Sequence, residues 1–266
     1  MSKEKKSIIV FLVITGLLSC ICYAIAILGG ESASSITAVL MWCPGIAALV
    51  VKKIYYRKER VFGFGKCKFR YIALAIVLPV IYLGLSYGIY WLINPSSFTG
   101  EVYSNSIPLM VSAFFTSMLT AMGEEIGWRG FLLPKMESVF NYKTAILLSG
   151  VIWAIWHFPL MITGQYQSGT PIYYQLPMFT LDIVLITAIM AYIRLKSNNI
   201  WPAIILHSSH NYFDQLIFQP LTDSPQSVYL VGETGLITII CTLMIVIFCY
   251  IKRKNGDINK MRATQD

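Results

Sequence analysis

The sequence predicts an all-α, polytopic integral membrane protein: a bundle of about eight transmembrane helices with both termini in the cytoplasm. Of its 266 residues, 56% are hydrophobic and only 13% are charged, and the mean hydropathy is +0.63. Soluble domains carry about 25% charged residues, so this composition indicates a membrane protein. Apolar runs of about 18 to 25 residues recur along the chain, close to the ~20 residues that a helix needs to cross ~30 Å of hydrocarbon.

The first four predicted spans are 7–29, 35–51, 70–94 and 106–133. The leader "MSKEKK" is positive, as in a secretory signal peptide. However, the apolar run after it is longer than the core of such a peptide and has no small-residue cleavage site, so we expect a retained helix. The fourth span contains charged residues near its end, which are considered below.

The last four predicted spans are 143–163, 177–195, 200–218 and 233–251, of which 200–218 contains several polar side chains. The sequence shows no internal repeat and no long soluble linker, so residues 1–266 are expected to form one membrane domain. The six cysteines show neither a paired spacing nor a CxxC motif, which argues against a disulfide framework or a cysteine metal site.

The positive charges predict the orientation. All of the 21 Lys and Arg residues except Arg129 fall in the leader, the loop 52–70, the next two loops on that side and the tail, and the alternate loops contain none. The positive-inside rule therefore places both termini in the cytoplasm, with an even number of crossings in the cell membrane. The net charge of +8 reflects this topology, so the lipid bilayer and not nucleic acid is the expected partner.

The stretch "AMGEEIGWRGFLL", residues 121–133, places Glu124, Glu125 and Arg129 inside an apolar helix. A charge at the centre of such a helix costs about 3 kcal/mol, so these residues are expected to face the bundle interior and to mark a site. Glu125 and Arg129 are four residues apart and can form an ion pair on one face. Glu124 is rotated from that pair by about 100°, which leaves its carboxylate for chemistry as a general base.

Two further spans repeat the four-residue spacing with polar groups. Trp153 precedes His157 by one turn, so its indole is expected to wall a pocket and to fix the imidazole. His207 and Asn211 present an imidazole and an amide to one point, a pair of donors suited to an oxyanion.

The depths of these groups agree. From the end of its helix near Pro134, Glu124 lies roughly 15 Å into the membrane, and His157 lies roughly 20 Å from the start of its span. His207 and Asn211 lie roughly 10 and 16 Å from the start of theirs. We therefore expect one site, in the cytoplasmic half of the membrane.

Three other polar residues are expected to lie outside the site. His210 is on a different face of its helix from His207, which favours a core residue with satisfied hydrogen bonds. Asp182 and Asp214 are near the outer ends of their spans and are expected to solvate or cap that interface.

The polar residues resemble the three motifs EExxxR, FxxxH and HxxxN of the CPBP family, which comprises CAAX proteases and bacteriocin-processing enzymes and is also named Abi. The resemblance covers residues 106–218, the expected catalytic core, and tryptophan replaces the usual phenylalanine of the second motif. The motifs are "EEIGWR" with Glu124, Glu125 and Arg129, "WAIWH" with Trp153 and His157, and "HSSHN" with His207 and Asn211.

This resemblance implies an intramembrane endopeptidase that acts on a membrane-associated peptide or protein. Glu124 and His157 would activate a water, and His207 and Asn211 would form the oxyanion hole. The other residues of the motifs, Glu125, Arg129 and Trp153, would support the site.

Three alternatives stay open. Glu124, His157 and His207 could instead hold zinc in a metalloprotease, although no HExxH motif is present and a metal-free mechanism without a cofactor is favoured. The same scaffold could serve as a bacteriocin immunity protein that needs no turnover. A proton-coupled transporter would also bury Glu and His residues, but the chain lacks repeated halves and paired broken helices.

Overall fold

The computed structural model describes residues 1–30, 35–102, 106–166 and 169–263, and its architecture is all-α, as predicted. An isolated bridge pairs Phe98 with Thr222. The long helices are α1 (Lys3–Gly29), α2 (Ile36–Tyr55), α3 (Phe69–Ile93), α4 (Ile107–Glu125), α6 (Tyr142–Ile162), α7 (Ile172–Ser197), α8 (Trp201–Tyr212) and α10 (Leu236–Ala263). The short elements are η2 (Pro95–Ser97), α5 (Leu133–Glu137), α9 (Ser227–Leu230) and two π-helical segments, η3 (Ile126–Leu132) and η4 (Phe213–Phe218).

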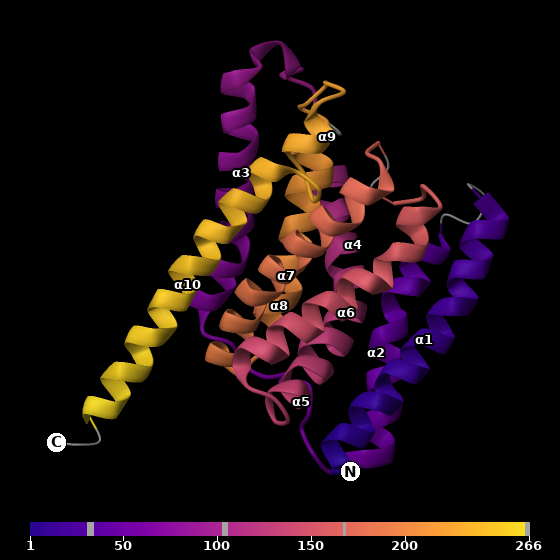
Figure 1. Ribbon diagram of the computed structural model, residues 1–266, viewed down its shortest axis with the longest axis vertical. Helices are drawn as coiled ribbons and strands as arrows, with labels where there is room; N and C mark the ends of the chain where they lie inside the picture. Colours follow the sequence, from indigo (N-terminus) through magenta and orange to yellow (C-terminus); the bar gives the residue numbers. More distant parts are fainter. Residues whose placement is uncertain (31–34, 103–105, 167–168, 264–266) are drawn as a thin grey trace.

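Seven helices in the described part of the chain are long and apolar enough to cross a membrane, and they match seven of the predicted spans. The remaining predicted span, 200–218, forms α8 and η4, whose polar side chains lower its hydropathy. α8 packs against α3, α4 and α7 inside the bundle. The start of α1 and the end of α10 lie at the same end of the bundle (Figure 1), as alternating crossings by these eight segments require. Which side of the membrane that end faces stays a prediction.

The outer surface of the bundle is apolar. On α1, residues four apart form an exposed stripe, which suits contact with lipid: Ile9, Val13, Leu17 and Ile21. The helices that carry the three motifs, α4, α6 and α8, lie in the middle, between α1 and α2 on one side and α3 and α10 on the other (Figure 1). The fold therefore places the motif residues away from lipid.

Helices α2 and α4 cross at very close range because glycines line the contact. A Cβ added to Gly45 would lie 2.5 Å from the carbonyl oxygen of Gly123, and one added to Gly127 would lie 2.6 Å from the carbonyl carbon of Pro44. Small residues allow such backbone contact between membrane helices. Since Gly123 directly precedes Glu124, this crossing fixes the backbone at the first motif.

The helix of the first motif changes from α to π geometry directly after Glu125, where η3 begins. π-helical turns alter the backbone hydrogen bonding and are frequent at functional sites. Here Arg194 of α7 donates from Nε to the carbonyl of Arg129 at 3.1 Å and from Nη2 to the carbonyl of Phe62 at 3.3 Å. Arg194 is one of the positive charges that predict the orientation, but it is only 3% exposed. Its side chain therefore also holds η3 against the loop 52–70.

Candidate active site

Glu124 lies in the last turn of α4, is 1% exposed and is held by two indoles. Its Oε2 accepts hydrogen bonds from Nε1 of Trp153 at 2.7 Å and from Nε1 of Trp128 at 3.3 Å. Both bonds use the same oxygen, and Oε1 makes no hydrogen bond with any described residue. The structure thus fixes this carboxylate firmly while leaving one oxygen for another partner.

Glu125 is the centre of a separate buried network. Its Oε1 accepts hydrogen bonds from Nη1 of Arg129 and from Nδ1 of His207, both at 2.9 Å. The second guanidinium nitrogen, Nη2, donates to Oγ1 of Thr187 at 3.0 Å. The structure therefore contains the ion pair that the spacing predicts, and it adds a contact to His207 that the spacing did not predict.

Trp153 in α6 contacts residues of both the first and the second motif. The guanidinium carbon of Arg129 lies 3.8 Å from the centroid of its ring, a cation–π contact. Its backbone carbonyl accepts a hydrogen bond from Nδ1 of His157 at 2.9 Å, while its indole binds Glu124. The phenylalanine usual at this position of the motif has no N–H and could not bind the carboxylate.

His157 has a defined tautomer. A carbonyl oxygen only accepts, so Nδ1 carries the hydrogen and the neutral ring keeps its lone pair on Nε2. The ring stacks on Tyr166, with centroids 5.5 Å apart and planes at 30°. His157 can therefore accept a proton at Nε2 without changing its orientation.

The four residues assigned to the chemistry line one cavity of about 340 Å³: Glu124, His157, His207 and Asn211. Threonine and serine hydroxyls and apolar side chains from α2, α4, α6 and η4 form the other walls. These side chains, which come from three helices that are distant in the chain, thus converge on one space, and their catalytic roles stay predictions.

The position of this cavity corrects one expectation. Thr37, at the start of α2, and Leu160, in the last turns of α6, belong to its wall, so it extends toward the end of the bundle opposite the start of α1. The expectation of a site in the half of the bundle nearer the termini is therefore wrong for this cavity. The depths above were counted along each helix separately, so they place single residues and do not show how far a cavity between helices extends.

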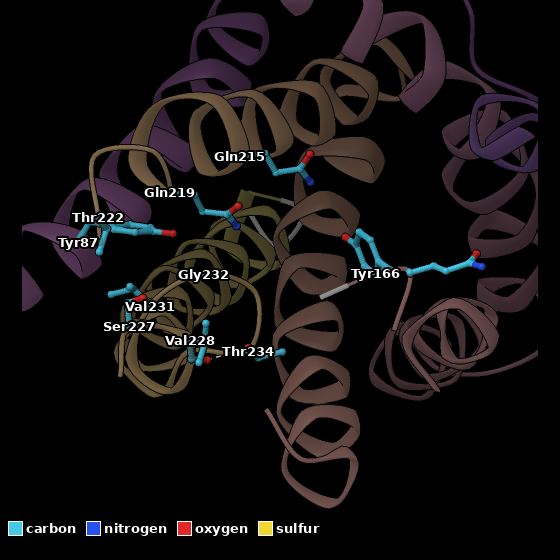
Figure 2. A pocket seen from close by; sticks show the side chains of 11 residues that line it. Tyr87, Tyr166, Gln215, Gln219, Thr222, Ser227, Val228, Val231, Gly232 and Thr234 are labelled. Atoms are coloured by element: carbon cyan, nitrogen blue, oxygen red, sulfur yellow. Dashed lines mark hydrogen bonds between the residues drawn. The ribbon is translucent and has the colours of Figure 1, made fainter. Parts of the chain in front are cut away.

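A second, polar pocket of about 490 Å³ adjoins the cavity, and Tyr166 and Gln215 line both. Figure 2 shows Tyr87 and Gln219 on one side of this pocket and Tyr166 on the other. Its walls offer amide and hydroxyl groups and no formal charge. Uncharged donors and acceptors suit water or a polypeptide backbone.

Next to the cavity the structure gathers four buried ionisable residues, the acidic cluster of Asp182, His210, Asp214 and Glu233. The first three were expected to lie outside the site. Asp182 and Asp214 are 0% exposed, so the expectation that they solvate or cap the outer interface is wrong. Each faces the bundle interior, where α7 and α8 pack together with α3 and α10. Sequence reasoning missed Glu233 because a charge at the first residue of a predicted span, here 233–251, is ordinary.

His210 is buried, as expected for a core residue, and its Nδ1 is bonded to the hydroxyl of Tyr82 at 2.7 Å. Its Nε2, in contrast, has no hydrogen-bond partner. The expectation of a fully satisfied core histidine is therefore wrong at this atom.

The zinc alternative requires Glu124, His157 and His207 to converge on one ion. Among the described residues, the set whose ligand atoms all lie within 4.8 Å of one another is a different one, His210 with two carboxylates of the acidic cluster. In the proposed zinc set, Nδ1 of each histidine is hydrogen-bonded, which would leave Nε2 as the ligand atom, as is usual for metal-binding histidines. The choice between a metal-free and a zinc-dependent mechanism therefore stays a prediction.

Comparison with known proteins agrees with the motifs. Residues 106–213 match the family model described as type II CAAX prenyl endopeptidase Rce1-like, and this segment contains every predicted site residue. Over 177 residues the chain is 30% identical to a protein named CAAX prenyl protease 2 from Methanococcus maripaludis. The aligned part is 65% of this chain and 61% of that protein, so the chain spans less than two thirds of this curated relative.

Proposed function

Because the chain belongs to the CPBP family, we propose that it is an intramembrane endopeptidase that cleaves a membrane-associated peptide or protein. One observation carries this proposal: a carboxylate, an imidazole base and two candidate oxyanion donors line the same cavity inside a bundle of membrane helices. Hydrolysis of a peptide bond needs these groups in one place.

Glu124 and His157 would activate the water. Oε1 of Glu124 and Nε2 of His157 are both acceptors that the protein leaves available on the cavity wall. A water that donates to both would lose a proton to one of them as its oxygen attacks the peptide carbonyl, and the proton would then pass to the leaving amine.

His207 and Asn211 would stabilise the oxyanion. In its imidazolium form His207 donates from Nδ1 to Glu125 and from Nε2 into the cavity, and Glu125 balances the charge. Asn211, one turn further along the helix, adds its amide N–H. Arg129 would keep the carboxylate of Glu125 in place, which is the supporting role that the motifs imply.

The substrate would enter from the end of the bundle opposite the termini. With the basic loops in the cytoplasm, as the charge distribution predicts, that end is extracytoplasmic. The polar pocket in Figure 2 would accept the backbone of a peptide there, and Leu40, Met41 and Leu216 would face its apolar side chains or a lipid tail. We therefore expect a substrate that is anchored in or exported across the membrane.

The test compares peptides in membranes that contain wild-type protein, the Glu124→Gln variant or the control Glu101→Gln, in which an exposed loop carboxylate is changed. Mass spectrometry should find an uncut membrane-associated peptide that accumulates only with Glu124→Gln. Thermal unfolding in detergent checks that this variant is folded. Identical peptide pools in all three membranes would refute the proposal, and protection against a peptide toxin by Glu124→Gln would favour the immunity protein.

A further inference from the structure

We propose that His210, Asp214 and Glu233 form a binding site for a divalent transition-metal cation, distinct from the residues assigned to catalysis. The ligand atoms of these three side chains all lie within 4.8 Å of one another. His210 and Asp214 are one helical turn apart and share a face, and Glu233 comes from the loop before α10. The site would therefore tie that loop to α8 and η4.

The charge balance of this region favours a cation. Asp182, Asp214 and Glu233 are each at most 2% exposed, and His210 is the basic partner that the structure shows for Glu233. Neither aspartate forms an ion pair with a Lys or Arg in the described part of the chain. Unpaired carboxylates are costly in a low-dielectric interior, and a divalent cation would compensate two of them.

Buried atoms without a hydrogen-bond partner point to the same ligand. Nε2 of His210 lies 3.4 Å from Oε1 of Glu233, yet it makes no hydrogen bond, and the side chain is 4% exposed. Both oxygens of Asp182 are also buried without a hydrogen-bond partner, and the charged groups that act on them are the other three members of the acidic cluster. One imidazole with two or three carboxylates is a ligand set for Zn²⁺ or Mn²⁺.

The surroundings resemble an outer coordination shell. Groups that bind metals usually make a second hydrogen bond that orients them, and here a tyrosine hydroxyl bonds each of the three ligands. The bonds are Tyr82 to Nδ1 of His210 at 2.7 Å, Tyr87 to Oδ1 of Asp214 at 2.8 Å and Tyr166 to Oε2 of Glu233 at 2.5 Å. The bond to Nδ1 leaves Nε2 of His210 as the ligand atom.

The pockets supply a route and a place for a water ligand. Tyr87 and Tyr166, which bond two of the ligands, line the polar pocket (Figure 2), so an ion could approach from there. A separate cavity of about 20 Å³ is bordered by His210 and Glu233 together with His157, and this volume holds about one water. Since Tyr166 also stacks on His157, an ion here would steady the wall of the catalytic cavity.

In the experiment, the 266-residue chain in detergent is treated with a chelator to remove bound metal, the chelator is removed, and ZnCl₂ or MnCl₂ is added alone. We expect about one bound metal ion per chain, measured by inductively coupled plasma mass spectrometry. The Tm should rise by about 5–10 °C at a hundredfold excess over Kd. Glu233→Gln and Asp214→Asn should lose both effects, whereas the control Glu124→Gln should keep them.

A milder variant tests the same site in case the charge variants do not fold. Tyr82→Phe keeps all three ligands and removes only the hydrogen bond to Nδ1 of His210, so it should weaken metal binding by about tenfold or more. Wild-type protein that binds neither metal and shows no Tm shift would overturn the proposal. So would loss of binding in Glu124→Gln with retention in Glu233→Gln, because that result places the metal among the catalytic residues.

Discussion

Replacing Glu125 by glutamine should destabilise the protein, whereas the same change at the adjacent Glu124 should leave it folded and inactive. Glu125 is 0% exposed and is the shared acceptor for Arg129 and His207. Glutamine there removes the charge opposite a guanidinium that is 1% exposed, so a buried cation loses its counter-ion. Breaking a buried ion pair in this way costs about 3–5 kcal/mol.

The substitution Glu124→Gln should cost much less stability than Glu125→Gln. In Glu124→Gln the amide oxygen can still accept the hydrogen bonds from Trp153 and Trp128, so only the charge assistance is lost, about 1 kcal/mol. At about 2–4 °C per kcal/mol for a chain of this size, Glu125→Gln should lower Tm by about 6–20 °C and Glu124→Gln by about 4 °C or less.

Thermal unfolding in detergent, followed by intrinsic fluorescence, measures both variants beside wild type. Cleavage by the same preparations below their Tm separates stability from chemistry: Glu124→Gln should be inactive at temperatures where it is fully folded. Equal Tm losses in the two variants would refute the assignment of a structural role to Glu125 and a chemical role to Glu124.

Thr187→Val leaves a guanidinium N–H of Arg129 without its acceptor and should cost about 1–3 kcal/mol, seen as a lower Tm; an unchanged Tm would contradict this contact. Gly127→Ala would bring a methyl group within 2.6 Å of the α2 backbone, so folded yield should fall, unlike in Gly16→Ala, whose Cβ meets nothing within 4 Å. Trp153→Phe keeps an aromatic ring but removes the 2.7 Å bond to the carboxylate of the first motif. Its Tm should fall by about 2–12 °C because a buried carboxylate loses a donor. Its kcat, measured below that Tm, should fall about tenfold, and an unaltered kcat would show that this bond does not position the base.

Much of the candidate site could be predicted because helix periodicity is local. The spacing of Glu125 and Arg129 is enough to predict their pairing, and the pair is observed at 2.9 Å. Comparison of depths along three helices grouped His157 with His207 and Asn211, and these residues line one cavity. Reasoning along single helices failed for Asp214 and Asp182, because spacing within one helix says nothing about which neighbouring helix covers a given face.

By itself the sequence determined the helical class, most of the spans and the residues of the motifs, since hydropathy and four-residue spacing depend only on neighbours along the chain. The tertiary structure decided which groups share a partner across helices: His207 with Glu125, Trp153 with Glu124, and Glu233 with His210. It also decided at which end of the bundle the cavity lies, because the walls of a cavity come from several helices that meet only when they pack.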